Sequence, residues 1–191
     1  MATANDYKYL FQDLGIDTGK LGCIMLDVEK IPVTDVIPEK ELWFKEDEPE
    51  SHTQGAVSEN EPHVTLLYGL MRSGLELKKH VNTLLGLDED DFDESDAIPE
   101  YVTIEKVDFF YSKDPADPYI TIIALVKISP ELSEANGRLR MLPHIDTFAS
   151  YKPHITLAYV KYSSDWKAYI ETLNTSLAGT SVSVTGLNYG D

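Results

Sequence analysis

The sequence has a single cysteine and no apolar run long enough to span a membrane. Cys23 is the only cysteine among 191 residues, which excludes an intrachain disulfide and a zinc site built from cysteines. Because Cys23 lies in an apolar, strand-like run, we expect a small core residue rather than a nucleophile. A membrane-spanning helix needs about 20 apolar residues, and the N-terminus lacks the pattern of a signal peptide. We therefore expect a cytoplasmic protein without membrane contact.

Basic residues are also scarce. Lys and Arg number 16 against 33 Asp and Glu, which gives a formal charge of −17. Because binding to nucleic-acid backbones depends on Lys and Arg that neutralise phosphates, we expect neither duplex nucleic acid nor long RNA as a partner. A small anionic ligand remains compatible with this charge, since the donors that line a pocket decide its binding. The sequence gives no indication of a protein partner.

One short phrase occurs twice in the chain. Residues 62–68 read PHVTLLY and residues 153–159 read PHITLAY, so five of seven positions are identical. Each copy places a histidine and a threonine two residues apart in a β-forming run, and alternate side chains of a strand share one face. Two such strands side by side would form a pocket suited to metal-free acid–base chemistry on a phosphate ester. The predicted catalytic residues are His63, Thr65, His154 and Thr156.

The residues around the motifs divide into lining and core candidates. Strict alternation places Leu67 and Ala158 on the histidine face and Tyr68 and Tyr159 on the opposite, core-facing side. Aromatic and basic side chains near the motifs are candidates for base stacking or phosphate contact. These predicted substrate-binding residues are Tyr111, Tyr151, Lys152 and Trp166.

The pattern along the chain predicts an α+β fold. Strands are expected over residues 21–28, 62–69, 101–111, 119–128, 151–160 and 181–189. Helices are expected over residues 73–85 with Ser73 as N-cap and Gly86 at the end, over 129–141 with Ser129 as N-cap, and over 163–177 with Ser163 or Ser164 as N-cap. Two acidic segments, 45–60 and 88–96, predict surface loops. For segment 45–60, which directly precedes the first histidine strand, the alternative to a surface loop is a lid over the site.

The spacing of the two motifs predicts an internal duplication. Residue 154 lies 91 positions after residue 63, close to half the chain, and each histidine strand is followed by a helix and a strand. We therefore expect a single domain over residues 1–191 with halves at roughly 21–98 and 99–191. Pseudo-two-fold symmetry would bring one histidine strand from each half to a central cleft.

These features resemble the 2H (two-histidine, LigT-like) phosphoesterases. The resemblance covers about residues 21–189 and rests on two His-x-Thr motifs, each preceded by Pro and followed by Leu-x-Tyr. It implies a bilobal fold, with two pseudo-symmetric antiparallel-sheet lobes flanked by helices, and a phosphoric diester hydrolase without cofactors. Residues 138–159 look most like the phage anti-CBASS enzymes, which destroy the cyclic nucleotides of bacterial immunity. That similarity implies viral immune evasion in the host cytoplasm.

The implied chemistry is attack on phosphorus by water or by a ribose 2′-hydroxyl. One imidazole removes a proton from the nucleophile and the other protonates the leaving oxygen, as suits a side chain whose unperturbed pKa is about 6.5. Thr65 and Thr156 would donate hydrogen bonds to the non-bridging oxygens. The symmetry of the motifs leaves open which histidine is the base. Paired histidines can also bind zinc, but neither motif carries the further ligands that a zinc site needs, so no metal is expected.

Three functions remain open at this point. The leading one is hydrolysis of a small 2′/3′-linked or cyclic (oligo)nucleotide, with an RNA 2′,3′-cyclic phosphodiesterase as the alternative within the enzyme class. A second is a binding module that sequesters a cyclic nucleotide without cleaving it. A third is a structural or interaction protein that uses its acidic loops, in which case the two histidines are ordinary strand residues.

Overall fold

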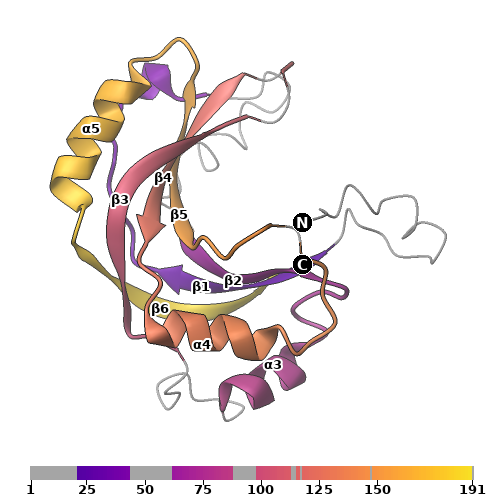
Figure 1. Ribbon diagram of the computed structural model, residues 1–191. Helices are drawn as coiled ribbons and strands as arrows, with labels where there is room; N and C mark the ends of the chain where they lie inside the picture. The colour runs from indigo at the N-terminus through magenta and orange to yellow at the C-terminus, as the bar shows by residue number, and fades with distance from the viewer. Residues whose placement is uncertain are drawn as a thin grey trace.

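The computed structural model describes residues 21–43, 62–87, 98–112, 115–116, 118–146 and 148–190. Within them the chain is α+β, as the sequence predicts, with one antiparallel sheet and three α-helices (Figure 1). No helix in these residues is long and apolar enough to cross a membrane. The acidic segments 45–60 and 88–96 lie outside the described residues. The elements are β1 (Gly22–Val28), a 3₁₀ helix (Glu39–Glu41), β2 (His63–Leu70), α3 (Lys78–Leu85), β3 (Tyr101–Tyr111), β4 (Tyr119–Val126), α4 (Pro130–Leu139), β5 (His154–Lys161), α5 (Trp166–Leu177) and β6 (Ser181–Gly190).

The helix ends follow local sequence signals at two of the predicted places. The Ser129 hydroxyl accepts a hydrogen bond from the Leu132 amide at 3.2 Å, with Pro130 as the first residue of α4. At the end of α3, Gly86 adopts the left-handed conformation (φ 71°) that glycine tolerates without strain. The predicted start of α4 at Ser129 and the predicted end of α3 at Gly86 are therefore confirmed.

Two helices start later than the sequence predicts. Residues 74–77 form a turn before α3, because the Gly74 amide donates to the Gly190 carbonyl at 2.8 Å and ties this turn to the end of β6. A Cβ at Gly74 would collide with the carbonyl oxygen of Cys23, so only glycine fits this close approach. Helix α5 likewise begins at Trp166 with Asp165 at the N-cap position, not at Ser163 or Ser164.

The strand order reads the same from both edges of the sheet. The order is β2-β1-β6-β3-β4-β5. When the chain is divided between β3 and β4, each edge is a motif strand that pairs with the first strand of its own half. The third position on each side is held by the last strand of the other half. The first set of three strands (β2, β1 and β6) and the second set (β3, β4 and β5) join through β3 and β6, whose short ladder has Val102 opposite Val182 at its centre. This strand order is one that an internal duplication would produce.

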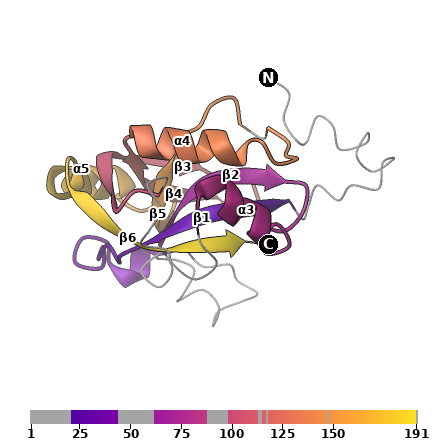
Figure 2. The same cartoon turned by 90° about the horizontal axis from the view of Figure 1, so that it is seen from below.

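The sheet is bent, and its helices lie on the outer side of the bend. In Figure 1, α5 lies outside β3 and β4, whereas α3 and α4 lie outside the strands of the first set. Figure 2 shows the second arrangement from below, with α3 and α4 beside β1, β2 and β6. The apolar side chains under these helices form the core, and each Val, Leu or Ile among them contributes about 1.5–3 kcal/mol on burial. Among those fully buried are Ile24, Leu26, Val64, Leu66, Ile122, Ala124 and Ile155.

Each motif strand has its free edge covered by a segment from the other half of the chain. Along β2, the Asn136 side-chain amide donates to the Leu66 carbonyl at 2.7 Å and the Ile145 amide donates to the Gly69 carbonyl at 2.8 Å. Along β5, the Trp43 amide donates to the Tyr159 carbonyl at 2.9 Å. The segment that precedes the second motif therefore covers β2, and the segment that precedes the first motif covers β5. Covered edges have their backbone groups satisfied, which protects a strand from pairing with other molecules.

Replacing Asn136 by Ala tests this coverage. The substitution leaves the part-buried Leu66 carbonyl without its side-chain donor, so we expect the free energy of unfolding to fall by about 1–3 kcal/mol. Urea denaturation followed by circular dichroism would measure it. Ser133→Ala, on the exposed side of the same helix, controls for helix propensity and should change stability by less than about 0.5 kcal/mol. Equal effects of the two substitutions would contradict the assigned role.

Candidate functional site

The two His-x-Thr motifs begin the two edge strands. His63 and Thr65 of β2 are half-buried, whereas the intervening Val64 is fully buried. His154 and Thr156 of β5 repeat this pattern around Ile155. The alternation predicted for the motifs is therefore present in both strands, with the polar side chains on one face and the apolar ones in the core.

The polar side chains of both motifs face the inner side of the bend. On the outer side of the first set, Tyr189 of β6 bonds to Asn82 of α3 and is in register with Ile24. The next residue of β1, Met25, therefore faces inward, and it is in register with Thr65. In the second set, Phe109 of β3 packs on α5, whereas the next residue, Phe110, meets the His154 ring with centroids 5.3 Å apart.

A bulge at the same place in each motif changes the faces predicted for the residues that follow. The register shifts beside Leu66 in β2 and beside Leu157 in β5, so each of these leucines is an extra residue in its ladder. Leu67 and Ala158 consequently join the core, at 5 % and 0 % exposure. The prediction that these two residues line the histidine face is wrong for this reason.

The bulge returns the two motif tyrosines to the inner face, opposite to the side predicted from strict alternation. Tyr68 is in register with Cys23 and Tyr159 with Thr121. A side-chain hydrogen bond joins Tyr159 to Thr156 and opposes the effect of burial, which raises the pKa of Tyr159. Tyr159 therefore contacts one of the predicted phosphate-binding hydroxyls and belongs to the site.

The bend brings β2 and β5 together although they are the two outermost strands. The Tyr151 hydroxyl, just before β5, donates to the Thr65 carbonyl of β2 at 3.0 Å. Figure 1 shows the start of β5 above β2 on the inner side of the bend. Tyr151, predicted as a substrate-binding residue, thus links the two motifs, and its burial raises the pKa of its phenol.

The His154 ring is oriented by its own strand and by β3. Its Nδ1 lies 3.0 Å from the Lys152 carbonyl, which only accepts hydrogen bonds, so Nδ1 carries the proton. This tautomer leaves Nε2 as the atom for proton exchange. Lys152 therefore contacts His154 through its main-chain carbonyl, while its side chain is exposed.

Two predicted substrate-binding residues lie on the outer face instead. Tyr111 and Trp166 contact one another with ring centroids 6.3 Å apart, and Trp166 is 8 % exposed between α5 and the sheet. Because Tyr111 follows Phe110 along β3, it projects from the opposite face to the one that bears His154. The aromatic side chain that lies beside the motif histidine is instead Phe110, which is 42 % exposed and contacts His154.

The first half of the inner face carries residues that the sequence interpretation assigned to the core or did not single out. Cys23 is half-buried on this face rather than in the core, because it alternates with Ile24. Asp27 is the cross-strand neighbour of His63. A charged residue inside an otherwise apolar strand was the available signal for Asp27, since Asp is unfavourable in strands without a specific partner.

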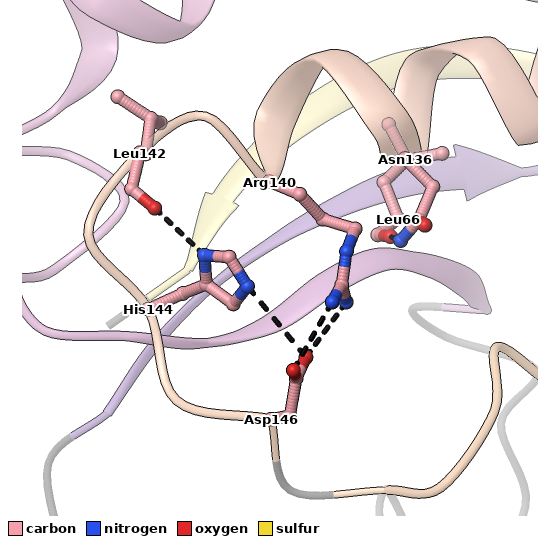
Figure 3. A network of polar contacts seen from close by, with 6 residues as sticks. All are labelled: Leu66, Asn136, Arg140, Leu142, His144 and Asp146. Carbon is pink, nitrogen blue, oxygen red and sulfur yellow. Dashed lines mark hydrogen bonds and ion pairs between the residues drawn. The ribbon is translucent and has the colours of Figure 1, made fainter.

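A second polar network lies beside the far end of β2 (Figure 3). Two guanidinium nitrogens of Arg140 contact the two carboxylate oxygens of Asp146 at 2.7 and 3.1 Å. His144 Nδ1 donates to the Leu142 carbonyl at 2.7 Å, and its Nε2 lies 3.6 Å from Asp146. The hydrogen bond from Arg140 lowers the pKa of the Asp146 carboxyl below its usual value. This network holds the segment that covers β2.

Among the described residues, no group of three or more His, Cys, Asp and Glu side chains is placed to hold a metal ion. The groups available for chemistry on the inner face include imidazoles, hydroxyls and the carboxylate of Asp27. No protein-family model matches the chain, and no curated protein matches it either.

Tyr151→Phe tests the link between the motifs. Loss of the hydrogen bond to Thr65 should lower the free energy of unfolding by about 0.5–1.5 kcal/mol at pH 7. Because burial raises the folded-state pKa of Tyr151, its contribution is complete below the unfolded pKa of about 10 and is lost as pH rises above it. Denaturant unfolding at pH 7 and above pH 10 should show the difference shrinking. A difference that grows at high pH would refute this account.

Asp146→Asn tests the network in Figure 3. The folded-state pKa of Asp146 is depressed, so its contribution is present above the unfolded pKa of about 3.9 and is lost as pH falls through the folded value. Because both partners are partly exposed, we expect only about 0.2–1 kcal/mol at pH 7. Unfolding measured at pH 7 and near pH 2 should give a difference at the first pH alone. The same difference at both values would contradict an electrostatic origin.

Proposed function

We propose that the chain is a metal-independent phosphodiesterase of the 2H type that hydrolyses a small 2′/3′-linked or cyclic (oligo)nucleotide. One observation carries the proposal. Two strands from opposite edges of one sheet present a histidine and a threonine each on the same inner face, and Tyr151 ties them together. Two imidazoles on one face are the equipment for simultaneous proton removal and proton donation.

The strand order supports a bilobal fold of the 2H type. Each set of three strands has a motif strand at its edge and helices on its outer side. In a bilobal arrangement the inner face between the two sets is where a substrate would meet both motifs. The exchange of the last strand between the two sets is the pseudo-symmetric arrangement expected of a duplicated domain.

The reaction uses the two histidines in opposite roles. One imidazole takes the proton from a water or ribose hydroxyl as its oxygen bonds to phosphorus. The other imidazole gives a proton to the leaving oxygen as its bond to phosphorus breaks, so protons and charge balance. Thr65 and Thr156 hydrogen-bond the non-bridging oxygens, where negative charge develops. Tyr159 holds the Thr156 hydroxyl through their mutual hydrogen bond.

Aromatic residues at His154 and farther along β5 support a nucleotide as the substrate. Phe110 contacts His154, and Tyr119 lies with its ring centroid 5.6 Å from that of Tyr159 and 4.4 Å from that of Trp43. Base stacking on such rings contributes about 1–3 kcal/mol per base. The formal charge of −17 favours a small nucleotide over long RNA. Removal of host cyclic-nucleotide signals by a phage is the biological role we propose on the similarity of residues 138–159.

Turnover of a nucleotide panel in EDTA is the test. The panel contains cyclic dinucleotides, 2′-5′ oligoadenylate and 2′,3′-cyclic mononucleotides, with products separated by chromatography. We expect at least one member to be hydrolysed, and His63→Ala and His154→Ala each to lower kcat/KM by about 10²–10⁴-fold. His80→Ala is the matched control, because His80 is exposed on α3, and it should leave kcat/KM unchanged.

Three other outcomes would refute the proposal in different ways. A nucleotide that is retained and released intact on denaturation would identify a sequestering module. Activity abolished by EDTA and restored by a metal would exclude the metal-independent mechanism. Turnover that persists in both histidine variants would place the active site elsewhere.

A further inference from the structure

The two motifs have the same backbone surroundings but different side chains beside the histidine. In the first half, Asp27 of β1 is in register with His63. In the second half, Leu125 of β4 occupies the equivalent position opposite His154. The symmetry that leaves the two histidines indistinguishable in sequence is therefore broken in the neighbouring strand.

The register places these neighbours as close to the histidines as a sheet allows. The Val28 amide donates to the Pro62 carbonyl at 3.0 Å, and the Val126 amide donates to the Pro153 carbonyl at 2.9 Å. Bonds that flank a pair in this way define a non-hydrogen-bonded pair, in which the Cα atoms are about 4.5 Å apart and the side chains project from one face. Asp27 therefore stands beside the His63 ring on the inner face.

The surroundings of Asp27 contain no cation on the adjoining strand. On its other side it pairs with Gly186 of β6, and the Asn188 side-chain amide lies 3.4 Å from its Oδ1 as a donor. Both β6 residues are uncharged, so among the residues in register with Asp27 the group that ionises is His63. The half-buried carboxylate thus has an imidazole as its cross-strand neighbour.

His154, unlike His63, has no carboxylate as its cross-strand neighbour. Its Nδ1–H donates to a main-chain carbonyl, its ring meets Phe110, and its cross-strand neighbour is apolar. The charged residues of β3 on this face are Lys106 and Asp108, which pair with each other at 3.4 Å. These two opposite charges pair with each other, the side chain of Lys152 is exposed, and the tautomer with a free Nε2 lone pair suits a base.

We infer that Asp27 is a positioning residue that assigns the roles of the two histidines: His63 is the acid and His154 the base. An adjacent carboxylate favours the imidazolium over the neutral ring, so His63 enters the reaction carrying the proton that the leaving oxygen takes. His154 Nε2 accepts the proton of the attacking hydroxyl, and proton exchange with water restores both rings. The inference rests on the proposed phosphodiesterase function.

Leaving-group dependence tests the role of each histidine. A 4-nitrophenyl ester of a nucleotide releases a phenolate that needs no protonation, whereas a dinucleotide releases an alkoxide that does. We expect His63→Ala to lower kcat/KM by about 10²–10⁴-fold for the dinucleotide and by less than tenfold for the nitrophenyl ester. His154→Ala should lower kcat/KM by a similar factor for both substrates. The reverse pattern would make His154 the acid and overturn the assignment.

The pH profile tests Asp27 itself. In Asp27→Asn, which keeps the shape of the side chain, the alkaline limb of kcat/KM should move to lower pH by about one unit, equivalent to tenfold in the protonated fraction. Asp108→Asn makes the same change on the same face beside the other motif and should leave that limb in place. Movement of the acid limb instead, or no movement of either limb, would overturn the inference.

A measurement without substrate separates this inference from the proposed function. The Cε1–H resonance of His63, followed by NMR against pH in the free protein, should titrate at lower pH in Asp27→Asn than in the wild type. If no nucleotide is hydrolysed but this shift is present, the proposed function fails while the Asp27–His63 coupling stands. If nucleotides are hydrolysed and the shift is absent, the function stands and Asp27 has no effect on His63.

Discussion

The approach of the two outermost strands of one sheet is the constraint on which the candidate site depends. Strands at opposite edges of a flat sheet would hold their side chains too far apart to act on one phosphate. The bend removes that separation, and the hydrogen bond from the Tyr151 hydroxyl to the Thr65 carbonyl joins the two edges. The bulge at Leu66 belongs to the same arrangement, because a bulge bends and twists its strand and the adjacent carbonyls of Thr65 and Leu66 both receive donors from the second half.

Local periodicity was sufficient to predict the motif strands, most element positions and the shared face of each histidine and threonine. It failed where a local pattern competes with tertiary contacts. No glycine or proline stands at or next to the bulges at Leu66 and Leu157, so the faces of Tyr68 and Tyr159 were predicted incorrectly. The helix expected from Ser73 starts at Lys78 because Gly74 is needed against β1 and β6. Tyr111 and Phe110 are both aromatic, and the sequence alone does not say which of them faces His154.

A duplicated domain faces a difficulty when its chemistry requires unlike partners. Two identical half-sites would hold two imidazoles in the same protonation state, whereas proton removal and proton donation need one of each. The backbone of the two motifs repeats the same features, with equivalent bulges and equivalent hydrogen bonds before each histidine. The side chains of the adjoining strands carry the difference, with a carboxylate beside one ring and a leucine beside the other. Under the proposed function, divergence in the adjoining strands would thus give different roles to two histidines whose motifs are equivalent.

The exchange of covering segments has a consequence for the independence of the two halves. An isolated first half would keep its motif strand but lose the chain around Asn136 and Ile145 that covers it, and an isolated second half would lose the chain at Trp43. Each fragment would expose the backbone groups of an edge strand, which is the arrangement that templates aggregation. The halves are therefore linked in folding: a gene fragment that encodes one motif would expose an uncovered edge strand and aggregate, because the covered edges form only when both halves are present.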